Sequence, residues 1–134
     1  MVQPNRGRKT GIELVWEAAR AASDKKAERV TILDVSRQLV ITDHFLICSG
    51  NTERQVRTIA DEIERRLIER VALKPLRREG QREARWVVLD FVDFIVHVFH
   101  KEEREYYNLE RLWADADITH WEDENEPAAA AEAP

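Results

Sequence analysis

Residues 86–100 read WVVLDFVDFIVHVFH, and this stretch carries the clearest strand pattern of the chain. β-Branched and aromatic residues dominate it, which favours strands. Its residues alternate at a period of two on either side of Val92 and Asp93, so the stretch is predicted to be a β-hairpin with these two residues in the turn. Position 91 then pairs with 94, position 89 with 96 and position 87 with 98.

The two faces of this hairpin differ in character. One face is wholly apolar and consists of Val87, Leu89, Phe91, Phe94, Val96 and Val98. The other face is mixed and consists of Trp86, Val88, Asp90, Ile95, His97 and Phe99. Because neighbouring side chains of a strand point to opposite faces, a slip of one residue would move His97 into the apolar set. The register is therefore well specified, and we expect the apolar face to lie in the core.

The mixed face of the hairpin has two explanations. Aromatic residues concentrate in protein interfaces, and central tryptophans are frequent hot spots, so this face is typical of a partner-binding surface. Alternatively, another helix of the same chain covers it. Composition favours both explanations equally.

Upstream of the hairpin, capping residues mark the beginnings of two helices. Thr10 with Glu13, and Thr52 with Gln55, have the spacing of a capping box. The first pair predicts a helix over residues 11–24, and the second predicts an amphipathic helix on the core. The apolar stripe of that second helix consists of Val56, Ile59, Ala60, Ile63 and Leu67.

The remaining elements follow from shorter patterns. Runs rich in β-branched residues predict strands over residues 29–36 and 41–49, and a further short strand is expected near 74–78. After the hairpin, residues 101–113 have helical character. This order of elements predicts an α/β protein, in which a mixed sheet is covered by helices mainly on one side.

The chain of 134 residues is expected to hold one domain at residues 11–115, between a flexible lead-in at 1–10 and a tail at 116–134. The tail is acidic and rich in alanine, so it is expected to be disordered. The formal net charge is −5, and no basic block dominates. Direct, sequence-specific binding to nucleic acid is therefore not expected, because a chain of this charge is repelled by bare RNA.

Cysteine usage and hydropathy predict a cytoplasmic protein. Cys48 is the single cysteine, which excludes an internal disulfide and fits a reducing compartment. No segment approaches the roughly 18 apolar residues of a membrane helix. The first residues lack the apolar stretch of a secretory signal.

Three groups of residues are candidates for a catalytic, anion-binding or metal-binding site. Cys48 lies in an apolar run, which is typical of a buried structural cysteine. Residues 49–52, Ser-Gly-Asn-Thr, lack the second glycine and the Gly-Lys end of a phosphate loop, so plain helix capping is favoured. Asp90, Asp93 and His97 lack further ligands nearby, which favours a hydrogen bond between His97 and Asp90 over a metal site. No catalytic residue, cofactor or metal is predicted.

Short motifs follow one another along the chain in a recognisable order. They include Asp24-Lys25-Lys26-Ala27-Glu28, Leu33-Asp34-Val35, Ile41-Thr42-Asp43-His44-Phe45, Ile47-Cys48-Ser49-Gly50, Ala60-Asp61-Glu62, Pro75-Leu76, Glu79-Gly80, Ala84-Arg85-Trp86-Val87-Val88-Leu89-Asp90, Val96-His97-Val98-Phe99, Arg104, Tyr107, Leu109-Glu110 and Leu112-Trp113. Over about residues 11–115, these motifs resemble the ribosomal silencing factor family, RsfS, also called Iojap.

The resemblance implies a small α/β domain with a nucleotidyltransferase-like topology but without that superfamily's catalysis. Members bind the fourteenth protein of the large ribosomal subunit at its intersubunit face. They thereby block joining of the two subunits and repress translation when nutrients are short. The family's tryptophan and aspartate that match Trp86 and Asp90 lie in or beside the partner-binding surface. On this basis the expected partner-binding residues are Trp86, Val88, Asp90, Asp93, Ile95, His97, Phe99 and Tyr107.

The sequence departs from the family at the hairpin turn. Members usually carry Gly-Asp there, whereas this chain has Val92-Asp93. A two-residue turn of this kind needs positive φ, which a β-branched valine resists, so either the turn type differs or the loop is longer.

A weak homodimer is expected. Two other functions stay open, namely a large-subunit assembly factor that uses the same surface and a divergent nucleotidyltransferase.

Overall fold

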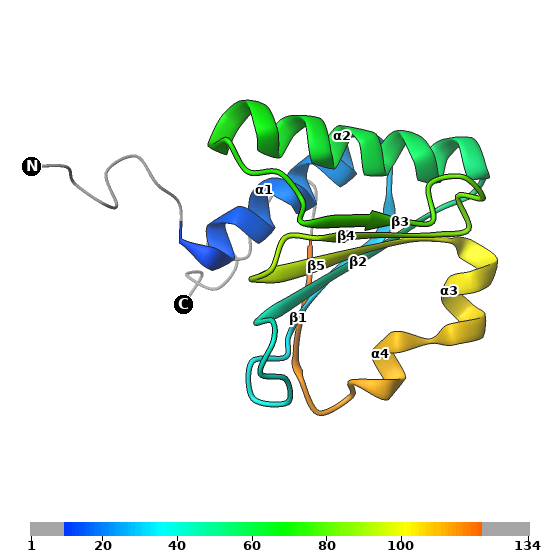
Figure 1. Ribbon diagram of the computed structural model, residues 1–134. Helices are drawn as coiled ribbons and strands as arrows, with labels where there is room; N and C mark the ends of the chain where they lie inside the picture. Colours follow the sequence, from blue (N-terminus) through cyan, green and yellow to red (C-terminus); the bar gives the residue numbers. More distant parts are fainter. Residues whose placement is uncertain (1–9, 122–134) are drawn as a thin grey trace, which may run out of the picture.

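Residues 10–121, which the computed structural model describes, form one six-stranded sheet flanked by helices (Figure 1). The helices are α1 (Gly11–Asp24), α2 (Glu53–Val71), α3 (Lys101–Tyr107) and α4 (Leu109–Leu112). The strands are β1 (Glu28–Asp34), β2 (His44–Gly50), β3 (Arg77–Glu79), β4 (Trp86–Asp90), β5 (Phe94–His100) and β6 (Asp117–His120). None of these helices combines the length and the apolar character that crossing a membrane requires.

The strand order β3-β4-β5-β2-β1-β6 places β5 and β2 at the centre of the sheet. These two strands run parallel, and every other pair is antiparallel. β2 is buried along almost its whole length, as its nearly continuous apolar run predicts. The predicted α/β class with a mixed sheet is confirmed. The relation to the nucleotidyltransferase topology stays a prediction.

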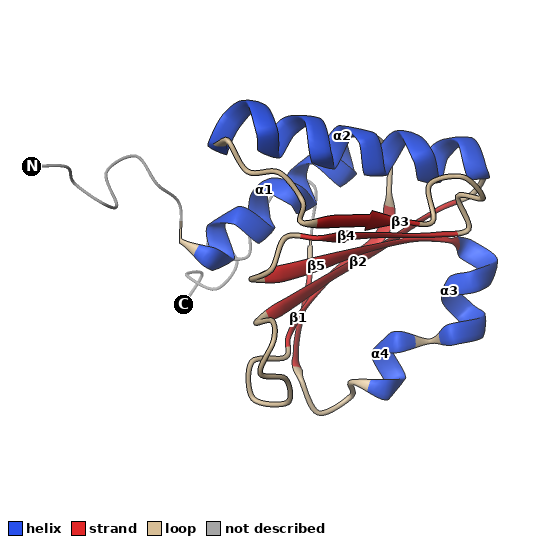
Figure 2. Ribbon diagram, viewed as in Figure 1, coloured by secondary structure: helices blue, strands red, loops and turns tan. Residues whose placement is uncertain are grey.

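Helices α1 and α2 pack side by side on one face of the sheet, which we call the inner face (Figure 2). Both begin at the predicted caps. The Thr10 hydroxyl accepts from the Glu13 N–H while the Glu13 carboxylate accepts from the Thr10 N–H, and the Thr52 hydroxyl accepts from the Gln55 N–H at 3.0 Å. The predicted stripe of α2 is buried against the inner face, so this helix shields the main core.

The hairpin has the predicted register. Val87 lies opposite Val98, and Leu89 lies opposite Val96. All six residues of its apolar face are buried in the core beneath α1 and α2. The strict alternation of apolar side chains is sufficient to specify this pairing, because any slip would bury Asp90.

The hairpin turn keeps two residues and places Val92 at a φ of 76°. The Phe91 N–H donates to the Phe94 carbonyl at 2.9 Å, and the Asp93 N–H donates to the Phe91 carbonyl at 2.9 Å. The second bond closes a γ-turn about Val92, a strained form that is rare for non-glycine residues. The Asp90 carboxylate accepts from the Val92 N–H at 2.8 Å and so helps to hold this conformation. The turn therefore differs in type and not in length.

The opposite face, which we call the outer face, is covered only over β1, β2 and the C-terminal end of β5. Helices α3 and α4 lie over this half (Figure 1) and enclose a second, smaller core. The buried residues of the second core are Leu33, Val35, Phe45, Ile47, Phe99 and Ala116.

A buried arginine ties α3 to the outer face. Arg104 is only 2% exposed, and its guanidinium donates to the Glu28 carbonyl at 3.2 Å, to the Thr31 hydroxyl at 3.2 Å and to the Ser49 hydroxyl at 3.3 Å. It also forms an ion pair with Glu110 of α4. Because a buried guanidinium needs such partners, Arg104 fixes the position of both short helices on the sheet.

The strands differ from their predicted bounds by one to three residues at their ends, and two larger differences lie towards the C-terminus. The helix expected over residues 101–113 divides into α3 and α4 at Asn108, whose φ is 50°. The domain does not end at residue 115, because Asp117–His120 forms β6 and pairs with β1, and Trp121 is buried after it. The four side chains of β6 are exposed, so the strand carries no apolar alternation that would have revealed it. Residues 1–9 of the expected lead-in and residues 122–134 of the expected tail lie outside the described residues.

Candidate protein-binding surface

The outer face stays open over β4 and the rest of β5. Trp86, Val88 and Asp90 of β4 and Ile95 of β5 are half-buried there, and Tyr107 of α3 stands beside them with 48% of its surface exposed. We call these five residues the open patch. Helices α3 and α4 cover the neighbouring half. The chain's own helices therefore cover only part of the mixed face of the hairpin.

Trp86 is held in the open patch by contacts on several sides. Its ring centroid lies 4.8 Å from that of Phe99 and 4.7 Å from that of Tyr107. Its indole N–H donates to Nδ1 of His97 at 3.1 Å. Aromatic contacts of this kind add to the energy of burial and restrict the ring to one orientation. The expected anchor of a protein interface is therefore a rigid one.

Two of the predicted partner-binding residues lie beneath the surface of the free protein. Phe99 is fully buried in the second core, and His97 is 7% exposed. The His97 ring packs edge-on against Phe45 at 4.8 Å. Burial lowers the pKa of His97 to about 4, so this side chain is neutral at physiological pH. These two residues support the open patch from below.

The prediction of a hydrogen bond between His97 and Asp90 is wrong. Nδ1 of His97 accepts from Trp86, whereas the Asp90 carboxylate accepts from the Val92 N–H and lies 3.6 Å from the guanidinium of Arg77. Asp90 therefore combines a role in the turn with a charge at the edge of the open patch. Asp93 is exposed in the turn itself, next to the open patch.

Exposed apolar residues that the sequence patterns did not single out lie on the elements around the open patch. Leu76, just before β3, is 67% exposed, and its N–H donates to the Asp90 carbonyl at 2.7 Å. Tyr106 and Leu112, on α3 and α4, are 81% and 72% exposed. They line a shallow groove with Tyr107, Asn108 and Arg111.

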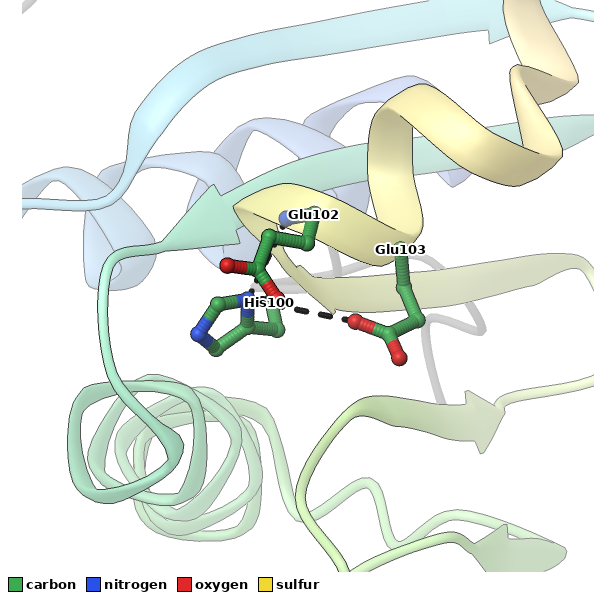
Figure 3. Close-up of side chains that lie close together, drawn as sticks. All are labelled: His100, Glu102 and Glu103. Carbon is green, nitrogen blue, oxygen red and sulfur yellow. Dashed lines mark hydrogen bonds and ion pairs between the residues drawn. The ribbon is translucent and has the colours of Figure 1, made fainter.

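One cluster of side chains has the composition of a metal site. His100, Glu102 and Glu103 lie together at the start of α3, as Figure 3 shows. Nδ1 of His100 already accepts from the Glu102 N–H at 3.1 Å and caps the helix. Arg85 forms ion pairs with both glutamates at 2.8 Å, which offsets part of their negative charge. A helix cap and an ion-pair network account for this cluster.

The two other chemical candidates have the structural roles predicted for them. Cys48 is fully buried in the core, and burial raises the pKa of its thiol to about 12, so the thiolate that nucleophilic chemistry needs does not form. Thr52 caps α2, and the Asn51 N–H donates to the Gln55 side chain at 2.7 Å. The N–H groups of Asn51 and Gln55 at this helix start therefore have partners within the chain.

Comparison with known proteins gives consistent matches. The family model described as "Ribosomal silencing factor during starvation" matches residues 8–134. Proteins named ribosomal silencing factor RsfS are similar in sequence. The one from Halalkalibacterium halodurans is 49% identical over 104 residues, which cover 78% of this chain and 88% of that protein. The one from Bacillus subtilis is 48% identical over 101 residues, which cover 75% of this chain and 85% of that protein.

A solved structure shares the fold. The crystal structure of a Bacillus halodurans protein superimposes with a TM-score of 0.69 at 48% sequence identity, and the match covers 76% of this chain and 94% of that one. The match therefore extends over most of both chains.

Proposed function

The chain belongs to the family of ribosomal silencing factors, RsfS, and from this membership we propose that it binds the large ribosomal subunit through that subunit's fourteenth protein. By occupying the intersubunit face, it keeps the small subunit from joining and represses translation when nutrients are limited. Its place of action is the cytoplasm. A weak homodimer of the free protein is part of the same proposal.

The observation that carries this proposal is the open patch. Half of the outer face is covered by the chain's own helices, whereas Trp86, Val88 and Ile95 stay accessible on rigid strands of the same sheet. Interfaces are typically built in this way, with a central aromatic anchor inside a rim of polar residues. Asp90 and Asp93 supply negative charge beside the anchor, which suits a basic ribosomal protein.

We further propose that the protein acts without catalysis. A nucleotidyltransferase would need carboxylates free to hold a metal ion, whereas Asp90 is engaged by the Val92 N–H and by Arg77. A divergent nucleotidyltransferase would bind a nucleoside triphosphate in the presence of Mg²⁺ or Mn²⁺. Calorimetric titration with both metals tests this alternative, and we expect no heat of binding. A large-subunit assembly factor would use the same surface, and it would differ in binding immature subunits more tightly than mature ones.

The test of the docking surface compares two substitutions in the open patch. Trp86→Ala removes the anchor, and truncation of such a hot spot costs at least about 2 kcal/mol of binding, or roughly thirty-fold in affinity. Asp90→Asn removes one negative charge but keeps an oxygen that can accept from the Val92 N–H, so we expect a several-fold loss of affinity with the hairpin intact. Affinity is measured for the isolated fourteenth protein and for purified large subunits.

Two control variants separate docking from folding. Asp61→Asn makes the same chemical change on the exposed side of α2, away from the outer face, and should leave both affinities unchanged. Val96→Asp places a charge in the core and should unfold the domain. If Trp86→Ala melts as early as Val96→Asp, this tryptophan is a core residue. If Trp86→Ala folds normally and binds like the wild type, the open patch is not the docking surface.

A further inference from the structure

We propose that His97 is a positioning residue, which holds the indole of Trp86 in the orientation that partner binding requires. This inference rests on the proposed docking function of the open patch. His97 itself is 7% exposed, so it acts on a partner only through Trp86.

The hydrogen bond between the two side chains fixes the chemical form of the histidine. The Trp86 indole can only donate, so Nδ1 of His97 must carry a lone pair, and the ring proton must lie on Nε2. Nε2 is buried and has no hydrogen-bond partner among residues 10–121. Burying an N–H without a partner is unfavourable, and an apolar ring at this position would avoid that cost.

The surroundings of His97 are otherwise apolar. Its ring packs edge-on against Phe45 at 4.8 Å between centroids and stacks on Phe99 at 6.2 Å. Phenylalanine would fill such a site without leaving a polar atom unsatisfied. Among residues 10–121, the bond to Trp86 is the one hydrogen bond that the imidazole makes, so the histidine contributes more to the position of Trp86 than to the core.

The direction of the bond explains why orientation matters. Phe99 and Tyr107 contact the indole in tilted arrangements, at interplanar angles of 30° and 45°, and such apolar contacts carry little directional preference of their own. The bond to His97 ties the N–H edge to the sheet and thereby selects one of the remaining orientations. A rigid anchor loses less conformational freedom on binding, which raises affinity without adding a contact to the partner.

The experiment uses two substitutions of His97 in the full chain. His97→Phe keeps an aromatic ring but removes the acceptor. We expect it to weaken binding to purified large subunits by about three- to ten-fold, the range of one lost neutral hydrogen bond, while its melting temperature stays the same or rises. His97→Asn keeps an acceptor near the place of Nδ1 and should restore most of the affinity despite its smaller volume.

A second readout follows Trp86 directly. The indole N–H signals of the four tryptophans are recorded by NMR, and the Trp86 signal is assigned by its loss in Trp86→Phe. In the wild type and in His97→Asn this N–H should exchange slowly with solvent, and in His97→Phe it should exchange quickly. In a Trp86→Phe background, His97→Phe should cause no further loss of affinity.

The outcomes distinguish this inference from the docking proposal. Wild-type affinity of His97→Phe, together with weak binding by Trp86→Ala, overturns the positioning role and leaves the docking surface in place. Wild-type affinity of Trp86→Ala overturns the docking surface and the positioning role with it. A third outcome would assign His97 to the core instead. In that case His97→Phe loses both affinity and melting temperature, and His97→Asn does not restore the affinity.

Discussion

The buried, neutral state of His97 makes the stability of the domain depend on pH. Its pKa is lowered from 6.5 to about 4 by burial, so between these values the unfolded chain binds a proton that the folded chain does not. Stability is therefore fully present above pH 6.5 and falls as the pH is lowered towards 4. The whole difference is worth about 3 kcal/mol, and lowering the pH from 7 to 5 realises about 2 kcal/mol of it.

The assay is urea unfolding at pH 7 and pH 5 for the wild type and for His97→Asn, which has no titratable group at this position. All other histidines and carboxylates are common to both proteins, so their contributions largely cancel in the comparison. The wild type should lose about 2 kcal/mol more than the variant over this range. Equal losses in the two proteins would show that His97 is not held neutral by burial, and the proposed geometry of Trp86 and His97 would be wrong.

Three further substitutions test the fold that supports the open patch. Ile63→Ala, in the fully buried stripe of α2, should cost about 2–5 kcal/mol in urea unfolding, and a loss below about 0.5 kcal/mol would mean that the stripe does not face the core. Arg104→Met should cost about 3 kcal/mol, since it leaves Glu110 without its buried partner; a loss under about 1 kcal/mol would show that this ion pair does not anchor α3 and α4. Val92→Gly should stabilise the domain by about 0.5–1 kcal/mol, because glycine relieves the strain of a φ of 76° at a half-exposed position. Destabilisation by Val92→Gly would mean that its apolar contacts outweigh the strain.

Sequence patterns predict the parts of this fold in which one periodic signal dominates. The hairpin register follows from strict alternation in residues 86–100, and α1 and α2 follow from capping residues joined to apolar stripes. In each case, a shifted register of the hairpin or a rotation of the helix would bury a charge or expose several apolar side chains. The physical penalty is large, and the pattern is correspondingly clear.

The parts that sequence patterns miss depend on contacts between distant residues. β6 has no apolar alternation, and its place in the sheet is set by pairing with β1 and by the burial of Trp121. The depth of His97 and Phe99 depends on where α3 and α4 lie, and Arg104 sets that position through partners on β1 and β2. For the candidate surface, alternation therefore separates the mixed face of the hairpin from its apolar face, but it cannot tell which residues of the mixed face are covered.

A subunit-joining assay shows directly whether the protein keeps the two ribosomal subunits apart. Purified large and small subunits are mixed with and without the protein, and the formation of complete ribosomes is followed on sucrose gradients. We predict that saturating wild-type protein keeps the subunits apart and sediments with the large subunit alone, and that Trp86→Ala needs roughly thirty-fold more protein for the same effect. Formation of complete ribosomes to the normal extent, with the wild-type protein bound to them, would contradict the proposed mechanism.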